Sequence, residues 1–334
     1  MYSQRERTEI KIFILQSAIF TEFHYFISHF RSLKQNLSES FFLKSFLDHL
    51  QCIERKIPGF AKKFVTSFAS ISGKKSHEPH YEQLVQMLAE LIVFGKLSYD
   101  FSSPDYSFKW EPIFGNSKKN PELSITSIDW CLLIEVKCPS FLKHIREASK
   151  HSIQLGARIG QVDFFNGLSD TGTATRPLDN KVKDYLISAN EKFKTFKEEE
   201  PSTHTILILV WTQHRYEAVS PLMNGICGLF TENSYLKQDS GLPVLFPYVD
   251  GVIVTSHYDA ILRGSRDEML PPGFSNPLDF GNKFDPQYND PIYIQNPAST
   301  NSRAVTFLDS FGALDYEEGR DPLVSAMDMI FWVR

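Results

Sequence analysis

A carboxylate and an ammonium group stand two positions apart near the end of an apolar stretch that runs from Trp130 to Pro139. If this stretch is a strand, its side chains alternate between two faces, and Glu135 and Lys137 share one of them. A run this apolar is typical of a central strand that is covered on both sides. A buried charge is costly unless it is paired or binds something. The two residues are therefore either a simple ion pair at a strand end or part of a site that binds a charged ligand.

A second carboxylate, Glu122, directly follows a proline in a short strand candidate at residues 120–126. Turn-forming residues 126–129 separate this candidate from the apolar strand, which indicates a hairpin. The hairpin would bring Glu122 close to the Glu135 end of its partner strand. Asp105 is the alternative second carboxylate, because it also follows a proline and lies 30 residues before Glu135. We favour Glu122 because a hairpin places it directly beside the apolar strand, whereas Asp105 would leave residues 111–119 as a long insertion before that strand.

A helix is predicted at residues 80–97, upstream of both strands. Its apolar residues recur at helical spacing and form one buried stripe, which consists of Leu84, Met87, Leu88, Leu91 and Phe94. Glu82 and Glu90 lie on a neighbouring face, and Glu90 is the one closer to the stripe. We expect Glu90 to be an accessory carboxylate of the site; a solvated helix glutamate is the open alternative.

The order of these elements resembles the PD-(D/E)xK nuclease superfamily, which has the restriction-endonuclease-like fold. The matching features are a helix with a carboxylate, a hairpin strand with a carboxylate after proline, and the strand that ends in Glu135-Val136-Lys137. Residues 180–196 resemble the helix that follows the catalytic strand in this family, and residues 205–211 resemble the next strand. The resemblance covers roughly residues 78–213, with one departure: the family usually has aspartate where this chain has Glu122.

The resemblance implies an α/β fold with a mixed sheet flanked by helices, and a metal-dependent nuclease that hydrolyses phosphodiester bonds. It implies that Glu122, Glu135 and the Val136 carbonyl hold Mg²⁺ or Mn²⁺, which prefer hard oxygen ligands. Lys137 would position the attacking water or neutralise the phosphate, and Glu90 would orient a water. DNA is expected as the substrate ahead of RNA. A catalytically inactive protein of the same fold, acting as a nucleic-acid-binding protein or scaffold, is the competing hypothesis.

The length of 334 residues and the uneven charge suggest more than one part. We expect a helical N-terminal domain at residues 1–76, the nuclease-like core at 77–215, and a loop-rich C-terminal extension at 216–334 packed on that core. Residues 1–75 carry 12 Lys and Arg against 6 Asp and Glu, a net charge of +6, although the whole chain has −5. This basic part is expected either to contact nucleic acid or to present an ordinary solvated face.

Local patterns predict further elements and exclude other classes. One amphipathic helix is expected within residues 10–30, whose charged residues argue against a membrane span. Further helices are expected at residues 38–55 and 140–159, and a linker at 72–76. The four cysteines show no metal-ligand spacing, and two of them, Cys131 and Cys138, sit within or beside the predicted core strand, which favours a reduced, cytoplasmic setting. A protein partner or a homo-oligomer stays open.

Overall fold

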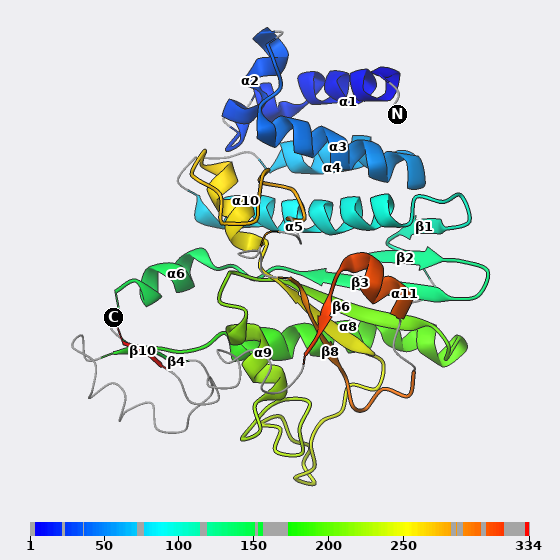
Figure 1. The fold of residues 1–334 in the computed structure, drawn as a ribbon, viewed down its shortest axis with the longest axis vertical. Coiled ribbons are helices and arrows are strands. Elements are labelled where there is room, and N and C mark those ends of the chain that lie inside the picture. The colour runs from blue at the N-terminus through cyan, green and yellow to red at the C-terminus, as the bar shows by residue number, and fades with distance from the viewer. Residues whose placement is uncertain are drawn as a thin grey trace.

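The computed structural model describes residues 4–21, 24–35, 37–71, 77–113, 119–150, 153–155, 173–281, 285, 290–301, 305–316 and 331–333. These residues form an α/β structure in which helices cover both faces of a mixed sheet (Figure 1). The predicted linker at 72–76 lies outside the described residues. None of the helices in the described part of the chain is both long and apolar enough to cross a bilayer.

The main sheet has seven strands. Their order across the sheet is β1 (Ser107–Trp110), β2 (Leu123–Thr126), β3 (Cys131–Lys137), β6 (His204–Val210), β7 (Gly251–Thr255), β8 (Ile292–Gln295) and β9 (Leu314–Asp315). The strands β1, β2 and β3 pair antiparallel, whereas β3, β6 and β7 pair parallel. β8 is antiparallel to β7 and parallel to β9. The sheet therefore extends into the segment after residue 215, which supplies β7, β8 and β9.

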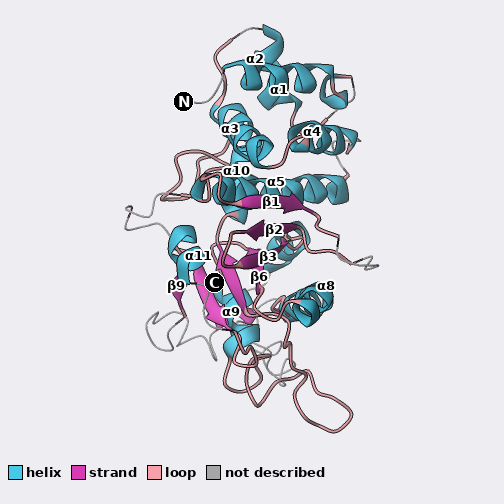
Figure 2. Ribbon diagram, turned by 90° about the vertical axis from the view of Figure 1, so that its right-hand side faces the viewer, coloured by secondary structure: helices cyan, strands magenta, loops and turns pink. Residues whose placement is uncertain are grey.

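β3 is an inner strand, as its apolar sequence predicts. It pairs with β2 on one side and with β6 on the other, and Leu132, Leu133 and Ile134 are buried. The predicted hairpin between residues 120 and 137 is confirmed, with Leu123 opposite Ile134. Parallel pairing of β3 with β6 requires a crossover connection, and this contains α8 (Asp179–Glu199). α5 (Glu78–Asp100) and α8 lie on opposite sides of the sheet, so both flanking helices occur where the sequence predicts them (Figure 2).

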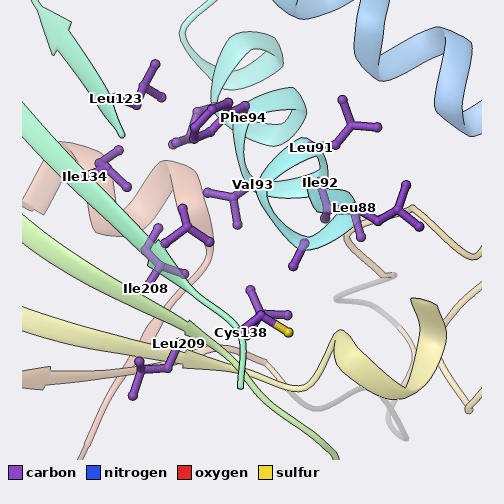
Figure 3. Close-up of a cluster of buried hydrophobic side chains, with 14 of the residues drawn as sticks. Leu88, Leu91, Ile92, Val93, Phe94, Leu123, Ile134, Cys138, Ile208 and Leu209 are labelled. Carbon is purple, nitrogen blue, oxygen red and sulfur yellow. The ribbon is translucent and has the colours of Figure 1, made fainter. Parts of the chain in front are cut away.

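The core of the α/β part lies between α5 and the sheet. Figure 3 shows Leu88, Ile92 and Phe94 of α5 in the same cluster as Leu123 of β2 and Ile134 of β3. All five side chains are almost fully buried. Burying a large aliphatic or aromatic side chain contributes roughly 1.5–3 kcal/mol, so this contact fixes the position of α5 over β3. It also fixes Glu90, which sits on the same helix.

Helices of the N-terminal part pack above α5 (Figure 1). They are α1 (Gln4–Gln16), the short 3-10 helix η1 (Ala18–Phe20), α2 (Ile27–Gln35), α3 (Phe41–Lys56) and α4 (Phe60–Ser70). Their buried side chains belong to the same core cluster as those of the sheet. The Ser40 hydroxyl accepts a hydrogen bond from the Leu43 N–H (3.2 Å) and caps α3.

The prediction of one helix within residues 10–30 is wrong, because α1 ends at Gln16. The Ser17 hydroxyl donates to the Ile14 carbonyl (2.7 Å) and accepts from the Ile19 N–H (3.4 Å). A serine that bonds to nearby backbone groups in this way competes with the helical hydrogen bonds. The chain therefore turns into η1, and a separate helix, α2, begins at Ile27.

The prediction of a helix over residues 140–159 is also wrong in its length. α6 covers only Leu142–Ala148, and β4 (Ile153–Leu155) follows. The Ser149 hydroxyl donates to the Arg146 carbonyl (2.9 Å), which favours an end to the helix there. β4 belongs to a second, small sheet with β5 (Ala174–Thr175) and β10 (Phe331–Val333).

Three more helices accompany the C-terminal strands: α9 (Tyr216–Met223), α10 (Tyr258–Ser265) and α11 (Val305–Phe311). α9 packs on α8, while α10 and α11 contact α5 on the other side of the sheet. β8 lies within residues 270–302, a stretch rich in Pro, Gly, Asn and Asp inside the extension that is predicted to be loop-rich.

Candidate active site

Glu122 lies at the point where the pairing between β2 and β3 ends. The ladder stops at Leu123, and the Glu122 N–H donates to the Ile134 carbonyl (3.1 Å). The preceding residue, Pro121, has no N–H and cannot continue the ladder. The Glu122 side chain turns toward β3, where Oε2 accepts a hydrogen bond from the Val136 N–H (3.0 Å). This backbone contact holds the carboxylate beside the end of β3.

Lys137 bridges the two carboxylates of the hairpin. Its Nζ lies 3.1 Å from Glu122 Oε1 and 2.5 Å from Glu135 Oε1. About a fifth of the Lys137 side chain is exposed, so its ammonium group can also face solvent or a ligand. Burial lowers the pKa of Lys137, but the charges of Glu122 and Glu135 outweigh this and leave it raised above its ordinary value. Lys137 is therefore a permanent cation at neutral pH.

Glu135 is fully buried, with 0% of the residue exposed. Its Oε1 atom accepts from Lys137 and also from Lys192 of α8, whose Nζ lies 2.6 Å away. Its Oε2 atom is buried and has no hydrogen-bond partner among the described residues. A buried carboxylate oxygen without a partner costs about 1–3 kcal/mol or more, so this atom is a natural position for a ligand.

Glu90 reaches the same group from α5, on the other side of the sheet. Burial, together with the nearby charge of Glu122, raises the pKa of Glu90 well above its usual range. Burial and the charge of Glu135 raise the pKa of Glu122 to about 7. The causes are common to both: burial is the largest, the neighbouring carboxylates add to it, and the ammonium groups of Lys137 and Lys192 offset part of the shift. Such a group takes up a proton or another cation readily.

The structure brings together Glu122, Glu135, Lys137 and Glu90, as the sequence predicts. Asp105, the alternative carboxylate, is exposed in the turn after α5 and accepts a hydrogen bond from the Ser103 hydroxyl (2.6 Å). Glu82 accepts from the Leu142 N–H (2.9 Å) at the start of α6, and therefore has a structural contact of its own. These contacts favour Glu122 over Asp105 and Glu90 over Glu82 as members of the site.

Lys192 of α8 contacts Glu135, although no residue of this helix is assigned to the site from the sequence. Two other polar residues of α8 have separate partners: Lys183 pairs with Asp184 (3.2 Å), and Asn190 accepts from the Tyr248 N–H (3.0 Å). One feature of the sequence could have identified Lys192 as a residue of the site. The buried residues of α8 include Leu186, Ala189 and Phe193, and Lys192 stands three residues after Ala189, which directs its side chain toward the sheet.

The donor set is chemically suited to a divalent cation. The carboxylates of Glu122 and Glu135 are hard oxygen ligands of the kind that Mg²⁺ and Mn²⁺ prefer, and Glu135 Oε2 is the unpartnered oxygen. In the part of the chain that is described, no group of three or more His, Cys, Asp or Glu side chains is placed to hold a metal ion. The expected set contains only two such side chains and the Val136 carbonyl, which is compatible with this observation. Mg²⁺ also retains several waters in many protein sites.

Comparisons with known proteins found no family model, no curated protein and no solved structure that matches this chain.

Proposed function

We propose that this protein is a metal-dependent nuclease of the restriction-endonuclease-like fold, with its active site at the β2–β3 hairpin. The observation that carries the proposal is the state of Glu135, a fully buried carboxylate with two lysines on one oxygen and no partner for the other among the described residues. A group that served only to hold the fold together would be expected to have both oxygens satisfied.

Glu122, Glu135 and the Val136 carbonyl are the proposed ligands of Mg²⁺ or Mn²⁺. A divalent cation held there would supply positive charge for the phosphodiester and make a bound water more acidic. The Val136 N–H fixes the Glu122 carboxylate beside β3. Glu90, whose raised pKa favours its protonated form, can donate a hydrogen bond or hold a proton at the same place.

Lys137 is the proposed partner of the attacking water or of the phosphate. Its Nζ contacts both carboxylates, and its charge is retained at neutral pH. An ammonium group at this position stabilises the negative charge that develops on the phosphate oxygens in the transition state. The substrate we propose is DNA, with the basic N-terminal part as a further contact to phosphates.

A second candidate function is a nucleic-acid-binding protein or scaffold without turnover. It is favoured by the two lysines, which between them contact both Glu122 and Glu135 and so offset charge without any metal ion. The two functions differ in whether the carboxylates are needed for a chemical step.

The test is incubation of the full chain with labelled single- and double-stranded DNA and RNA, in Mg²⁺, in Mn²⁺ and in EDTA. Cleavage of DNA that stops in EDTA supports the proposal. Cleavage of RNA alone would correct the substrate. Binding without cleavage, under every cation condition, would overturn the nuclease proposal in favour of the second candidate.

A further inference from the structure

Lys192 belongs to a helix that carries several lysines with different surroundings. Lys194 pairs with Glu198 one helical turn further on, at 3.8 Å and with more than half of its side chain exposed. Lys192 instead crosses to the sheet, where its Nζ contacts Glu135 Oε1 at 2.6 Å with 21% of its side chain exposed. Lys194 is therefore an ordinary surface lysine, and Lys192 is part of the site.

The contact has an unusual distribution of charge. Lys137 and Lys192 meet the same Glu135 oxygen, at 2.5 and 2.6 Å, while the other oxygen has no described partner. One lysine suffices to pair with a single buried carboxylate. The second ammonium group brings an additional positive charge to a place where two like charges repel each other.

The additional charge matters when the charges of the site, the cation and the phosphodiester are added together. Glu90 is counted as neutral, because its raised pKa favours the protonated form. With Glu122 and Glu135 ionised, the two carboxylates and two lysines sum to 0; a divalent cation changes this to +2, and one phosphodiester anion then brings it to +1. Without Lys192 the same three sums would be −1, +1 and 0, so Lys192 makes the site less attractive to the cation and more attractive to the anion.

We propose that Lys192 is a positioning residue that sets the charge of this site, an inference that rests on the proposed nuclease function. Its charge beside Glu135 lowers the affinity of the site for the divalent cation. The same charge raises the affinity for the phosphodiester once the cation is bound. Its long, partly exposed side chain allows the ammonium group to remain near Glu135 while facing the substrate.

The inference predicts opposite effects of one substitution on two ligands. Lys192→Met removes the charge and keeps most of the apolar side chain. We expect the dissociation constant for Mn²⁺ alone, measured by titration calorimetry of the full chain, to fall about tenfold. In the presence of Mn²⁺ we expect the affinity for a labelled DNA duplex to fall about tenfold, because each unit charge close to a phosphate contributes strongly at a partly buried site. The DNA affinity would be measured as KM if the duplex is cleaved and by fluorescence anisotropy if it is not.

Two further variants are the controls. Lys192→Arg keeps the charge and should stay within about twofold of the wild type for both ligands. Lys194→Met removes a lysine from the exposed side of the same helix and should leave both affinities unchanged. A merely structural role of Lys192 would lower the thermal stability of the Met variant without moving the two affinities in opposite directions. Should Lys192→Met fail to fold, Lys192→Gln carries the same test.

The inference is overturned if Lys192→Met binds Mn²⁺ no more tightly than the wild type, or if its DNA affinity equals that of Lys194→Met. The outcome is separate from that of the nuclease proposal. Tighter Mn²⁺ binding and weaker DNA binding without any cleavage would support the charge inference while the nuclease proposal fails. Cleavage by the wild type, with Lys192→Met indistinguishable from Lys194→Met, would do the reverse.

Discussion

Helix α8 supplies a lysine to each of two buried carboxylates. The two carboxylates differ in whether both of their oxygens have hydrogen-bond partners. Lys197 forms a buried pair with Asp250, at the start of β7. The same Asp250 oxygen accepts from the Ser299 hydroxyl, and the other accepts from the Thr205 N–H (2.9 Å), the Thr205 hydroxyl (3.1 Å) and the Asn301 amide (3.2 Å). Five residues earlier on the helix, Lys192 meets Glu135, one of whose oxygens has no partner in the described structure.

The comparison separates a group that stabilises the fold from one that is available to a ligand. The Asp250 group joins α8, β6, β7 and the segment after β8, and every contact is made within the protein. A fully satisfied polar network of this kind rigidifies the structure. The Glu135 group consists of Glu90, Glu122, Glu135, Lys137 and Lys192, and so contains more carboxylates than lysines. The pKa of Glu122 is raised to about 7 and that of Glu90 is also raised, which is the pattern expected of a functional site.

Substitution of Glu135 should have the largest effect on activity. Glu135→Gln removes the charge of the central proposed ligand while keeping its shape, and we expect the rate of DNA cleavage to fall by about 10³-fold or more. The folded structure should persist, since Lys192 is partly exposed and can turn to solvent. The measurement is a cleavage assay in Mg²⁺ together with a thermal melt.

Glu191→Gln is the matched control, because Glu191 pairs with Lys119 on the surface of the same helix that carries Lys192. It should retain full activity. If Glu135→Gln cleaves DNA as fast as the wild type, the nuclease proposal fails and the Glu135 group becomes a second structural network.

Asp250 should show the opposite behaviour. Asp250→Asn leaves Lys197 buried without a counter-charge, which is expected to lower the free energy of unfolding by about 3–5 kcal/mol. Urea denaturation measures this loss, and a cleavage assay on the folded fraction should show nearly wild-type activity. A variant with normal stability but no activity would show that the Asp250 group also serves the reaction. It would contradict the distinction between a group that stabilises the fold and a group that binds a ligand.

Lys137 should affect turnover more than cation binding. Lys137→Met removes the ammonium group that we assign to the water or the phosphate, and a decrease in kcat of about 10²-fold is expected. The affinity for Mn²⁺, measured by calorimetry, should be retained or increased, because Lys137 ligates no cation. Loss of Mn²⁺ binding in this variant would show that the lysine acts by holding Glu122 and Glu135 in place.

The parts of the fold that could be predicted from the sequence are those with a strong local period. The apolar run of β3 and the amphipathic stripes of α5 and α8 each identify one element and its buried face. The hairpin then places Glu122 beside Glu135 through a short connection. The contact of Lys192 could not be predicted with the same certainty, because α8 carries several lysines and only the packing of the helix decides which one meets β3.

The Asp250 group shows a different limit of sequence reasoning. Its partners come from Thr205, Lys197 and a loop after residue 295, so nothing in the local pattern around Asp250 indicates them. The break at Ser17 is similar in kind: the apolar residues continue through it at helical spacing, and two hydrogen bonds between the Ser17 hydroxyl and the backbone mark the end of α1. Both depend on contacts that periodicity does not record.

The smallest effects are expected from two variants that sharpen the assignment of the second carboxylate. Glu122→Asp shortens the side chain by one methylene group and keeps the charge. The carboxylate should still approach Lys137 and the end of β3, but its contact with the Val136 N–H depends on the full length of the glutamate. We therefore expect a decrease in the cleavage rate of about tenfold, well short of the loss expected for Glu122→Ala, since a shift of about 1 Å in a catalytic group can cost up to about 10²-fold.

Asp105→Ala should change neither the cleavage rate nor the affinity for Mn²⁺. Asp105 is exposed, contacts Ser103 within its own turn, and has no described contact with Glu122, Glu135 or Lys137. Loss of the hydrogen bond from the Ser103 hydroxyl should lower the free energy of unfolding only slightly, as is usual for exposed positions. The informative result is the ranking of the variants in one cleavage assay. If Asp105→Ala is inactive while Glu122→Ala retains activity, the second carboxylate is Asp105, and α5 and β1 must rearrange when the substrate binds.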